Sequence, residues 1–131
     1  MNRFLVFLIV ATLFNYSCKE IDDSKIEVVT TEEMQELSQL EDLQIVDIRT
    51  PEKRKEEFIA NPQNIDYLSP SFEQDIEKLD KSKPVLVYCK TGDQSVKCVK
   101  KMKDAGFVKI YDLDEAIAKW KFKGLDIKSI P

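Results

Sequence analysis

A cysteine followed by a short polar loop is the clearest chemical feature of the sequence. Cys89 comes directly after the apolar run 85–88 and precedes Lys90, Thr91, Gly92, Asp93, Gln94 and Ser95. If a strand ends at Cys89 and a helix begins after the loop, backbone N–H groups and the positive end of the helix dipole face the sulfur. Both favour thiolate over thiol, so we expect a nucleophile here whose persulfide anion the same N–H groups would stabilise.

Two residues are expected to shape this loop. Gly92 lets the backbone curl with a positive φ, and Ser95 is predicted to cap the following helix. The alternative for Cys89 is a buried free thiol that packs as a small hydrophobic residue, which the loop after it disfavours. Cys98 lies on the predicted apolar side of the helix, so we expect packing there rather than a resolving thiol. A Cys89–Cys98 disulfide stays open for an oxidising compartment.

The charge balance and the lack of histidine narrow the possible chemistry. Lys and Arg number 20 against 24 Asp and Glu, the net charge is −4, and the chain has no His. The usual general base and the commonest metal ligand are therefore missing, and we expect neither a metal nor an organic cofactor. Because a nucleic-acid binder usually carries a basic excess, nucleic acid is not an expected partner, and the charged runs are interpreted as solvated helix faces.

The first residues have the pattern of an export signal. Arg3 precedes an apolar stretch at 4–14 that is too short to span a bilayer, so residues 1–17 are predicted to be a signal peptide. Cys18 stands at the change from apolar to polar sequence, where a bacterial lipoprotein would be lipidated, and residues 18–25 would form a polar tether. We expect an exported cell-envelope protein that is lipid-anchored or periplasmic. An ordinary signal peptide with an incidental Cys18 is the alternative.

The rest of the chain, residues 26–131, is predicted to be one domain. Short apolar runs alternate with amphipathic segments, which indicates an α/β fold with a mostly parallel sheet. The predicted strands are 26–29, 43–48, 63–65, 85–88 and 108–111. The predicted helices are 30–40, 51–58, 71–79, 95–104 and 114–121, with a capping box at Thr30 and Glu33 and a cap at Ser71. In such sheets ligands bind beyond the carboxyl ends of the strands, where Cys89 is expected.

Several side chains are predicted to fill the core. Val96, Val99 and Met102 are expected on one side of their helix, and Gly106 is expected to close that helix in the left-handed conformation. Aromatic residues of the last third are interpreted as core and rim packing: Phe107, Tyr111, Trp120 and Phe122.

Three segments in this order resemble the rhodanese family of sulfurtransferases, over nearly all of 26–127. They are 45–65, which begins Ile-Val-Asp-Ile-Arg-Thr-Pro-Glu, the loop 87–95, and 106–124 with its Gly-Phe start. The loop is most similar to that of small periplasmic rhodaneses of the phage-shock type. The resemblance implies a rhodanese-like three-layer α/β domain with a central, mostly parallel five-stranded sheet flanked by helices.

The resemblance also implies an activity. Cys89 would be the catalytic residue, and residues Lys90 to Ser95 would bind an anionic substrate, with Asp47 and Arg49 as supports. The reaction would move a sulfane sulfur from thiosulfate or a similar donor to cyanide or a thiol acceptor through a Cys89 persulfide, in a protein expected to be a monomer.

The sequence also departs from the family pattern. Many members end the loop with Arg where Gln94 stands here, and Asp93 adds a negative charge beside the thiolate. Phe58 replaces a usual His, and residues 115–116 replace two glycines. A non-catalytic rhodanese-like interaction or sulfur-carrier module is therefore the first alternative.

Two other enzyme classes are weaker alternatives. A cysteine phosphatase or arsenate reductase would need Arg to clamp the oxyanion where Ser95 stands. A thiol-disulfide oxidoreductase would need a Cys-x-x-Cys pair, which Cys89 lacks.

Overall fold

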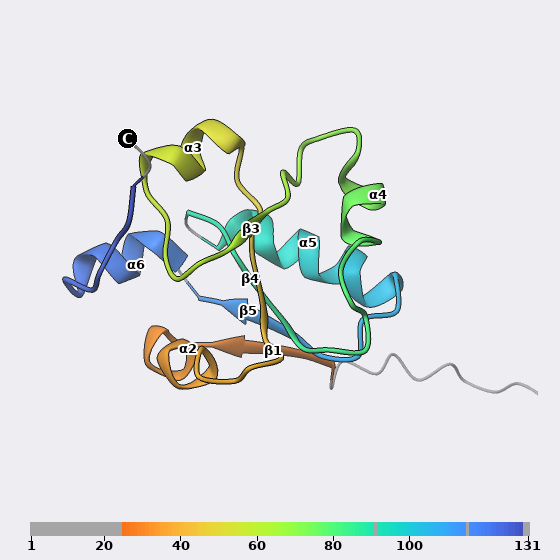
Figure 1. Ribbon diagram of the computed structural model, residues 1–131, viewed down its shortest axis with the longest axis horizontal. Helices are drawn as coiled ribbons and strands as arrows, with labels where there is room; N and C mark the ends of the chain where they lie inside the picture. The colour runs from red at the N-terminus through yellow and green to blue at the C-terminus, as the bar shows by residue number, and fades with distance from the viewer. Residues whose placement is uncertain (1–24, 91, 115, 130–131) are drawn as a thin grey trace, which may run out of the picture.

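Five parallel strands form the centre of the molecule. The computed structural model describes residues 25–90, 92–114 and 116–129. The strands are β1 (Ile26–Val29), β2 (Gln44–Asp47), β3 (Gln63–Asn64), β4 (Val85–Tyr88) and β5 (Ile110–Leu113), in the order β1-β5-β4-β2-β3. Every ladder between them is parallel. Because β4 lies in the middle, the carboxyl end that carries Cys89 is central to the sheet; the arrows of β1 and β5 point to the same edge (Figure 1).

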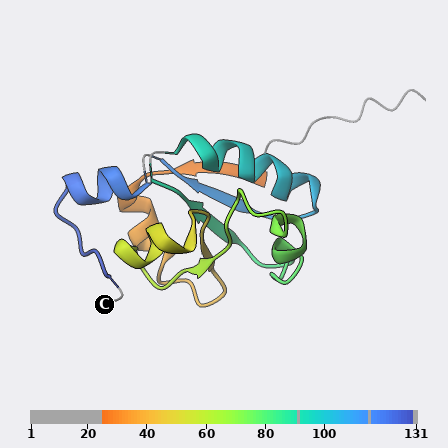
Figure 2. The same cartoon turned by 90° about the horizontal axis from the view of Figure 1, so that it is seen from above.

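Helices cover both faces of this sheet. They are α2 (Thr31–Leu37), α3 (Pro51–Glu56), α4 (Phe72–Ile76), α5 (Asp93–Asp104) and α6 (Ala116–Phe122). Figure 2 shows α5 on one side of the sheet and α2 on the other. Parallel sheets need this double cover, because both faces of their strands are apolar.

The central strand divides the core between the two faces. All four residues of β4 are buried, and they alternate between two hydrophobic clusters. Val85 and Val87 face the cluster beneath α4 and α5, whereas Leu86 and Tyr88 face the cluster on the side of α2 and α6. The same alternation places Cys89 on the α4/α5 side.

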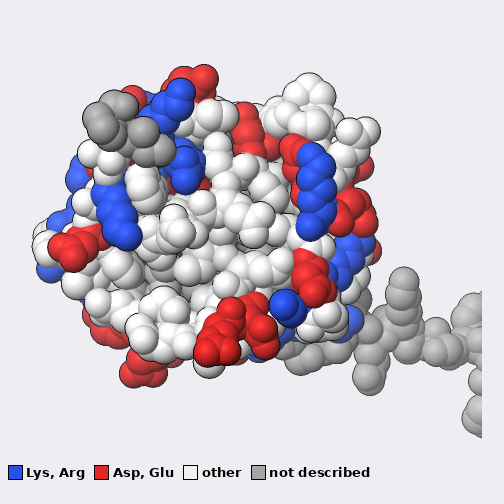
Figure 3. Space-filling model, viewed as in Figure 1, with Lys and Arg blue, Asp and Glu red and all other residues white. Residues whose placement is uncertain are grey.

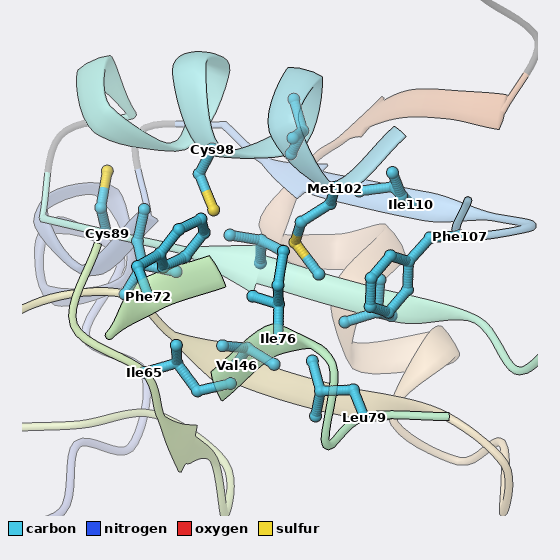
Figure 4. Close-up of a cluster of buried hydrophobic side chains, with 14 residues drawn as sticks. Val46, Ile65, Phe72, Ile76, Leu79, Cys89, Cys98, Met102, Phe107 and Ile110 are labelled. Atoms are coloured by element: carbon cyan, nitrogen blue, oxygen red, sulfur yellow. The ribbon is translucent and has the colours of Figure 1, made fainter. Parts of the chain in front are cut away.

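The α4/α5 cluster is the larger one. Phe72 and Ile76 reach it from α4, and Cys98 and Met102 reach it from α5, with Cys89 at one end (Figure 4). Because these side chains come from elements far apart in the sequence, their burial fixes α5, and with it the loop before α5, against the carboxyl end of β4.

Local signals set most of the helix starts. The capping box before α2 is present: the Thr30 hydroxyl accepts from the Glu33 N–H at 3.2 Å, and Glu33 accepts from the Thr30 N–H at 2.7 Å. Pro51 opens α3, where its missing N–H costs nothing. Gly106 has φ 101° just after α5, as predicted.

The predicted α/β fold with a five-stranded parallel sheet is confirmed, whereas several element ends were wrong. Helix α2 ends at Leu37 and α4 at Ile76, because tighter turns with i−3 hydrogen bonds follow each of them. Helix α3 ends at Glu56, because the backbone of Phe58 pairs with Lys128 instead.

The last strand and helix both start two residues later than predicted. The N–H group of Val108 is held by the Lys81 carbonyl at 3.1 Å, and the ladder with β1 begins only at Ile110. At the other end, the Asp114 N–H still bonds to the Val29 carbonyl at 2.9 Å, so α6 starts beyond it.

Three packing predictions also need correction. Ser95 is not the N-cap of α5, because the helix begins at Asp93 with Gly92 as its N-cap. Val96 does not share the buried side of α5 with Val99 and Met102, because it is 48% exposed. Phe122 is 90% exposed at the end of α6, whereas Phe107 and Trp120 pack in the core as predicted.

Charged side chains lie mainly at the rim of the face shown in Figure 3, where basic and acidic residues are mixed and the centre is uncharged. The exposed ion pair between Lys53 and Glu56 of α3, at 3.5 Å, agrees with a solvated helix face. Among residues 25–90, 92–114 and 116–129, no helix is long and apolar enough to cross a membrane. The predicted signal peptide and the Cys18 anchor fall outside the described residues.

Candidate active site

Cys89 is a free thiol at the carboxyl end of β4. The residue is only 2% exposed, and the Gly92 N–H donates to its Sγ at 2.9 Å. In Figure 4 the sulfur points toward the start of α5 and away from the packed cluster. A backbone donor at this distance stabilises negative charge on sulfur, which is the property that the sequence predicted for this loop.

The loop between Cys89 and α5 is held from the helix side. Gly92 has φ 95° and ψ −17°, a left-handed conformation that a residue with a Cβ adopts at a cost. The Ser95 hydroxyl, which is fully buried, donates to the Gly92 carbonyl oxygen at 2.8 Å. Ser95 therefore clamps the residue whose N–H faces the sulfur, although it does not cap the helix.

The other side of the loop is held by α6. The N–H of Ile117 donates to the Cys89 carbonyl at 3.4 Å, and the N–H of Ala118 donates to the Lys90 carbonyl at 3.1 Å. The first turn of a helix has N–H groups without intrahelical partners, and here they bind the loop instead of water. Two helices thus fix the backbone on both sides of the sulfur.

A buried ion pair stands at the end of the neighbouring strand β2. Arg49 Nη2 lies 2.6 Å from Asp47 Oδ2, and Arg49 Nε lies 3.0 Å from Asp47 Oδ1. The two residues are 6% and 0% exposed. Burial by itself would lower the pKa of Arg49, but the Asp47 hydrogen bond and charge outweigh it and raise that pKa. The guanidinium therefore stays charged beside the site.

Further hydrogen bonds fix this pair. Arg49 Nη2 donates to the Glu57 carbonyl at 2.5 Å, and the Asn64 amide donates to the backbone carbonyls of Asp47 and Arg49. The prediction that Asp47 and Arg49 support the site agrees with these contacts, since they join the ends of β2, α3 and β3 into one frame.

A cavity of about 420 Å³ opens over Cys89. It is lined by Arg49, Thr50, Lys53, Asp66, Leu68, Cys89, Lys90, Asp93 and Gln94. Three cationic side chains thus face two carboxylates and one thiol. The mixed charge distinguishes this cavity from a purely cationic anion pocket, and the charge of Arg49 is offset by its buried partner Asp47.

The structure brings most of the predicted site residues together. Lys90, Asp93 and Gln94 line the cavity, and Gly92 contacts the sulfur. Ser95 does not line it, because its hydroxyl points to the Gly92 carbonyl from behind the loop. Thr91 lies outside the described residues.

The sequence analysis missed four lining residues: Thr50, Lys53, Asp66 and Leu68. Thr50 directly follows Arg49 and Lys53 lies four residues after it, so a lysine one helical turn beyond Arg49 was an available signal. Asp66 and Leu68 come from the irregular stretch after β3, where no sequence pattern marks them.

Cys98 is buried like Cys89 but lies away from the cavity. It is a free thiol with 0% exposure in the middle of the α4/α5 cluster. Burial, together with the charge of Asp112, raises the pKa of Cys98 to about 12. The prediction that Cys98 is a packing residue is confirmed by this position, and the two thiols do not form a disulfide.

Comparison with known proteins decides the family. The sequence matches the rhodanese-like domain over residues 30–123. The chain belongs to the rhodanese-like domain family. Its relatives include the thiosulfate sulfurtransferase GlpE of Coxiella burnetii, which is 35% identical over 86 residues, 66% of this chain and 78% of that protein.

Solved structures show the same fold. A rhodanese-like domain protein from Staphylococcus aureus superposes with a TM-score of 0.65 at 26% identity, covering 79% of this chain and 99% of that one. The polysulfide-sulfur transferase homodimer from Wolinella succinogenes gives a TM-score of 0.63 at 25% identity, covering 81% and 80%. The rhodanese fold expected from the three sequence segments is therefore confirmed. Within the described residues, no group of three His, Cys, Asp or Glu side chains could hold a metal ion.

Proposed function

We propose that this protein is a sulfurtransferase in which Cys89 carries a sulfane sulfur atom as a persulfide. The observation that carries the proposal is the Gly92 N–H at 2.9 Å from Cys89 Sγ, in a cavity that is also lined by Lys53 and Lys90. This donor would stabilise both the attacking thiolate and the persulfide anion that replaces it.

The proposed reaction has two displacement steps at sulfur. The Cys89 thiolate attacks the sulfane sulfur of a donor such as thiosulfate; a new S–S bond forms, the donor S–S bond breaks, and sulfite leaves with the electron pair. Cyanide or an acceptor thiolate then attacks the terminal sulfur of the persulfide, which gives thiocyanate or a new persulfide and releases the Cys89 thiolate. No external oxidant or reductant is needed.

Two lysines in the cavity wall would hold an anionic donor. The charge of Arg49 is shared with its partner Asp47, so Lys53 and Lys90 are the cavity-lining cations that would bind an anion near Cys89. The Coxiella burnetii relative is named a thiosulfate sulfurtransferase, which supports a thiosulfate-type donor for this chain. Gln94 lines the cavity in place of a fixed cation, and we infer that anion binding here depends on the flexible Lys53 and Lys90.

We also propose that the protein works outside the cytoplasm, attached to a membrane through a lipid on Cys18, as a monomer resembling the small periplasmic rhodaneses. The apolar stretch at 4–14 followed by Cys18 supports export. Acyl mass on Cys18 in protein from a bacterial membrane fraction is the expected result. Unmodified Cys18 in a fraction that stays soluble without detergent would overturn this proposal.

The sulfur-carrier function is tested by intact-protein mass spectrometry. The reduced full chain is incubated with thiosulfate beside Cys89→Ser and Cys98→Ser, which change one buried thiol each. We expect the mass of one added sulfur atom in the wild type and in Cys98→Ser, and none in Cys89→Ser. No added sulfur in the wild type with thiosulfate or with a polysulfide donor would favour a non-catalytic interaction module.

A further inference from the structure

A buried carboxyl group lies beneath the Cys89 loop and has no part in the proposed displacement steps. Asp112 is in β5 and is 5% exposed. It pairs in register with Val87 of β4, two residues before Cys89, and lies on the α4/α5 side of the sheet because Ile110 does. Its Oδ1 atom is buried and has no hydrogen-bond partner.

The buried, unpaired Oδ1 disfavours the ionised carboxylate, since negative charge on this atom would have neither water nor a hydrogen-bond donor to stabilise it. Burial accordingly raises the pKa of Asp112, while the Ser95 hydroxyl, as hydrogen-bond partner, partly opposes the rise. Asp112 thus stays protonated to a higher pH than a solvated aspartic acid.

Ser95 connects this carboxyl group to the active-site loop. Its hydroxyl donates to the Gly92 carbonyl at 2.8 Å, and the Gly92 N–H donates to Cys89 Sγ at 2.9 Å. A hydroxyl group has one proton to donate. A protonated Asp112 donates to Ser95 Oγ and leaves that proton for Gly92. An ionised Asp112 can only accept, so it competes with the Gly92 carbonyl for the same proton.

We propose that Asp112 is a positioning residue for the Cys89 loop, which it controls through the hydrogen bond of Ser95 to Gly92. In the protonated state the loop is clamped with the Gly92 N–H on the sulfur. When Asp112 ionises, the Ser95 proton turns to the carboxylate, the clamp weakens, and Cys89 loses part of its fixed donor. The reactivity of Cys89 therefore depends on the charge of a residue that never contacts the substrate.

Other titratable groups surround Asp112. On α5 they are Cys98, whose own pKa the Asp112 charge raises, and Lys101, which acts on Cys98 in the opposite direction. Asp114 lies just beyond β5 and further raises the pKa of Asp112. Cys89 is at the end of β4. Cys98 and Asp114 become anionic when they ionise, so both disfavour the ionised form of Asp112.

The test compares Asp112→Asn with the wild type in the full chain. Asparagine has the same shape, is never charged and can donate to Ser95 Oγ at every pH. The rate of Cys89 modification by a dipyridyl disulfide is measured by peptide mass spectrometry from about pH 4.5 to about pH 8.5, a range that starts above the pKa of a free aspartic acid. Asp104→Asn, at the exposed end of α5, is the control.

We expect the ratio of the Asp112→Asn rate to the wild-type rate to be near one at the acid end and to rise to roughly fivefold at the alkaline end, the effect of one hydrogen bond. In a Ser95→Ala background the rise should disappear, because the connecting hydroxyl is gone. A flat ratio would overturn the proposal. A rise that persists without Ser95 would also overturn it, since it would show a direct charge effect.

This inference rests on the proposed function for its consequence in sulfur transfer, but the modification rate needs no sulfur donor, so the two can fail separately. A second measurement uses the wild-type chain and avoids any folding defect of a variant. In a carbon-13 NMR titration, the Asp112 carboxyl and the Gly92 carbonyl signals should shift with the same midpoint. Different midpoints would contradict the connection through Ser95.

Discussion

The surroundings of Cys89 and Cys98 contrast sharply, although both thiols are almost completely buried and lie nine residues apart. Cys89 is at the carboxyl edge of the sheet, where the Gly92 N–H, a buried ion pair and a charged cavity meet. Cys98 is in the middle of the α4/α5 cluster among apolar side chains. Burial alone therefore does not decide whether a cysteine is reactive; the polar groups that remain next to the sulfur do.

The largest expected effect is the difference in alkylation between the two thiols. Because the pKa of Cys98 is raised to about 12, only a very small fraction of it is thiolate near neutral pH. With iodoacetamide on the native chain, we expect Cys89 to react at least about a thousandfold faster than Cys98, counted by peptide mass spectrometry.

Unfolding the chain in denaturant supplies the control, since both thiols should then react at similar rates. If Cys98 reacted as fast as Cys89 in the native protein, the contrast drawn from their surroundings would be wrong.

A second prediction compares the polar frame at the sheet edge with the apolar cluster. Asp47→Ala leaves the Arg49 guanidinium buried without its partner, and we expect it to lower the free energy of unfolding by about 3–5 kcal/mol. Met102→Ala, in the cluster, is expected to cost about 2–5 kcal/mol through the cavity it creates. Urea unfolding measures both.

The two variants should differ at Cys89. Asp47→Ala is expected to slow persulfide formation per folded molecule, because Arg49 lines the cavity, whereas Met102→Ala should leave that rate close to the wild-type rate. Equal losses of rate in both variants would mean that the frame acts only through stability.

The smallest effect concerns the two glycines at the ends of α5. Gly92 and Gly106 have φ 95° and 101°, so each Ala substitution is expected to cost about 1–2 kcal/mol of stability from backbone strain. Only Gly92 donates to Cys89 Sγ, so only Gly92→Ala should also slow Cys89 alkylation, by severalfold. Thermal unfolding and alkylation of the same two samples provide the measurement, and a matching loss of alkylation in Gly106→Ala would contradict it.

Sequence reasoning identified the strands more reliably than the helix ends. Val85 to Tyr88 is an uninterrupted apolar run, so β4 and its carboxyl-end cysteine could be predicted without tertiary information. Helix α3 could not be bounded in the same way, because it ends where the backbone after Glu56 pairs with Lys128, a contact between segments about seventy residues apart. Such distant pairing leaves no local pattern.

The residues of the site also divide into those that were predicted from the sequence and those that were not. The loop after Cys89 was predicted from its residue types, whereas the pair of Asp47 and Arg49 was predicted from the resemblance to the rhodanese family. Asp66 and Leu68 line the cavity only because an irregular segment folds over it. Asp112 directly follows the predicted strand 108–111, and only the structure places it inside a strand, because β5 runs to Leu113.

The sequence by itself determined the alternation of strands and helices, the position of Cys89 at the end of a buried strand and the left-handed Gly92. These follow from side-chain hydrophobicity and local backbone sterics, which act over a few residues. Only the tertiary structure decided that Ser95 faces inward to hold Gly92 and that Asp112 lies beneath the loop. Those outcomes depend on how α5 packs on the sheet. This packing is determined by many contacts between residues that are distant in the chain.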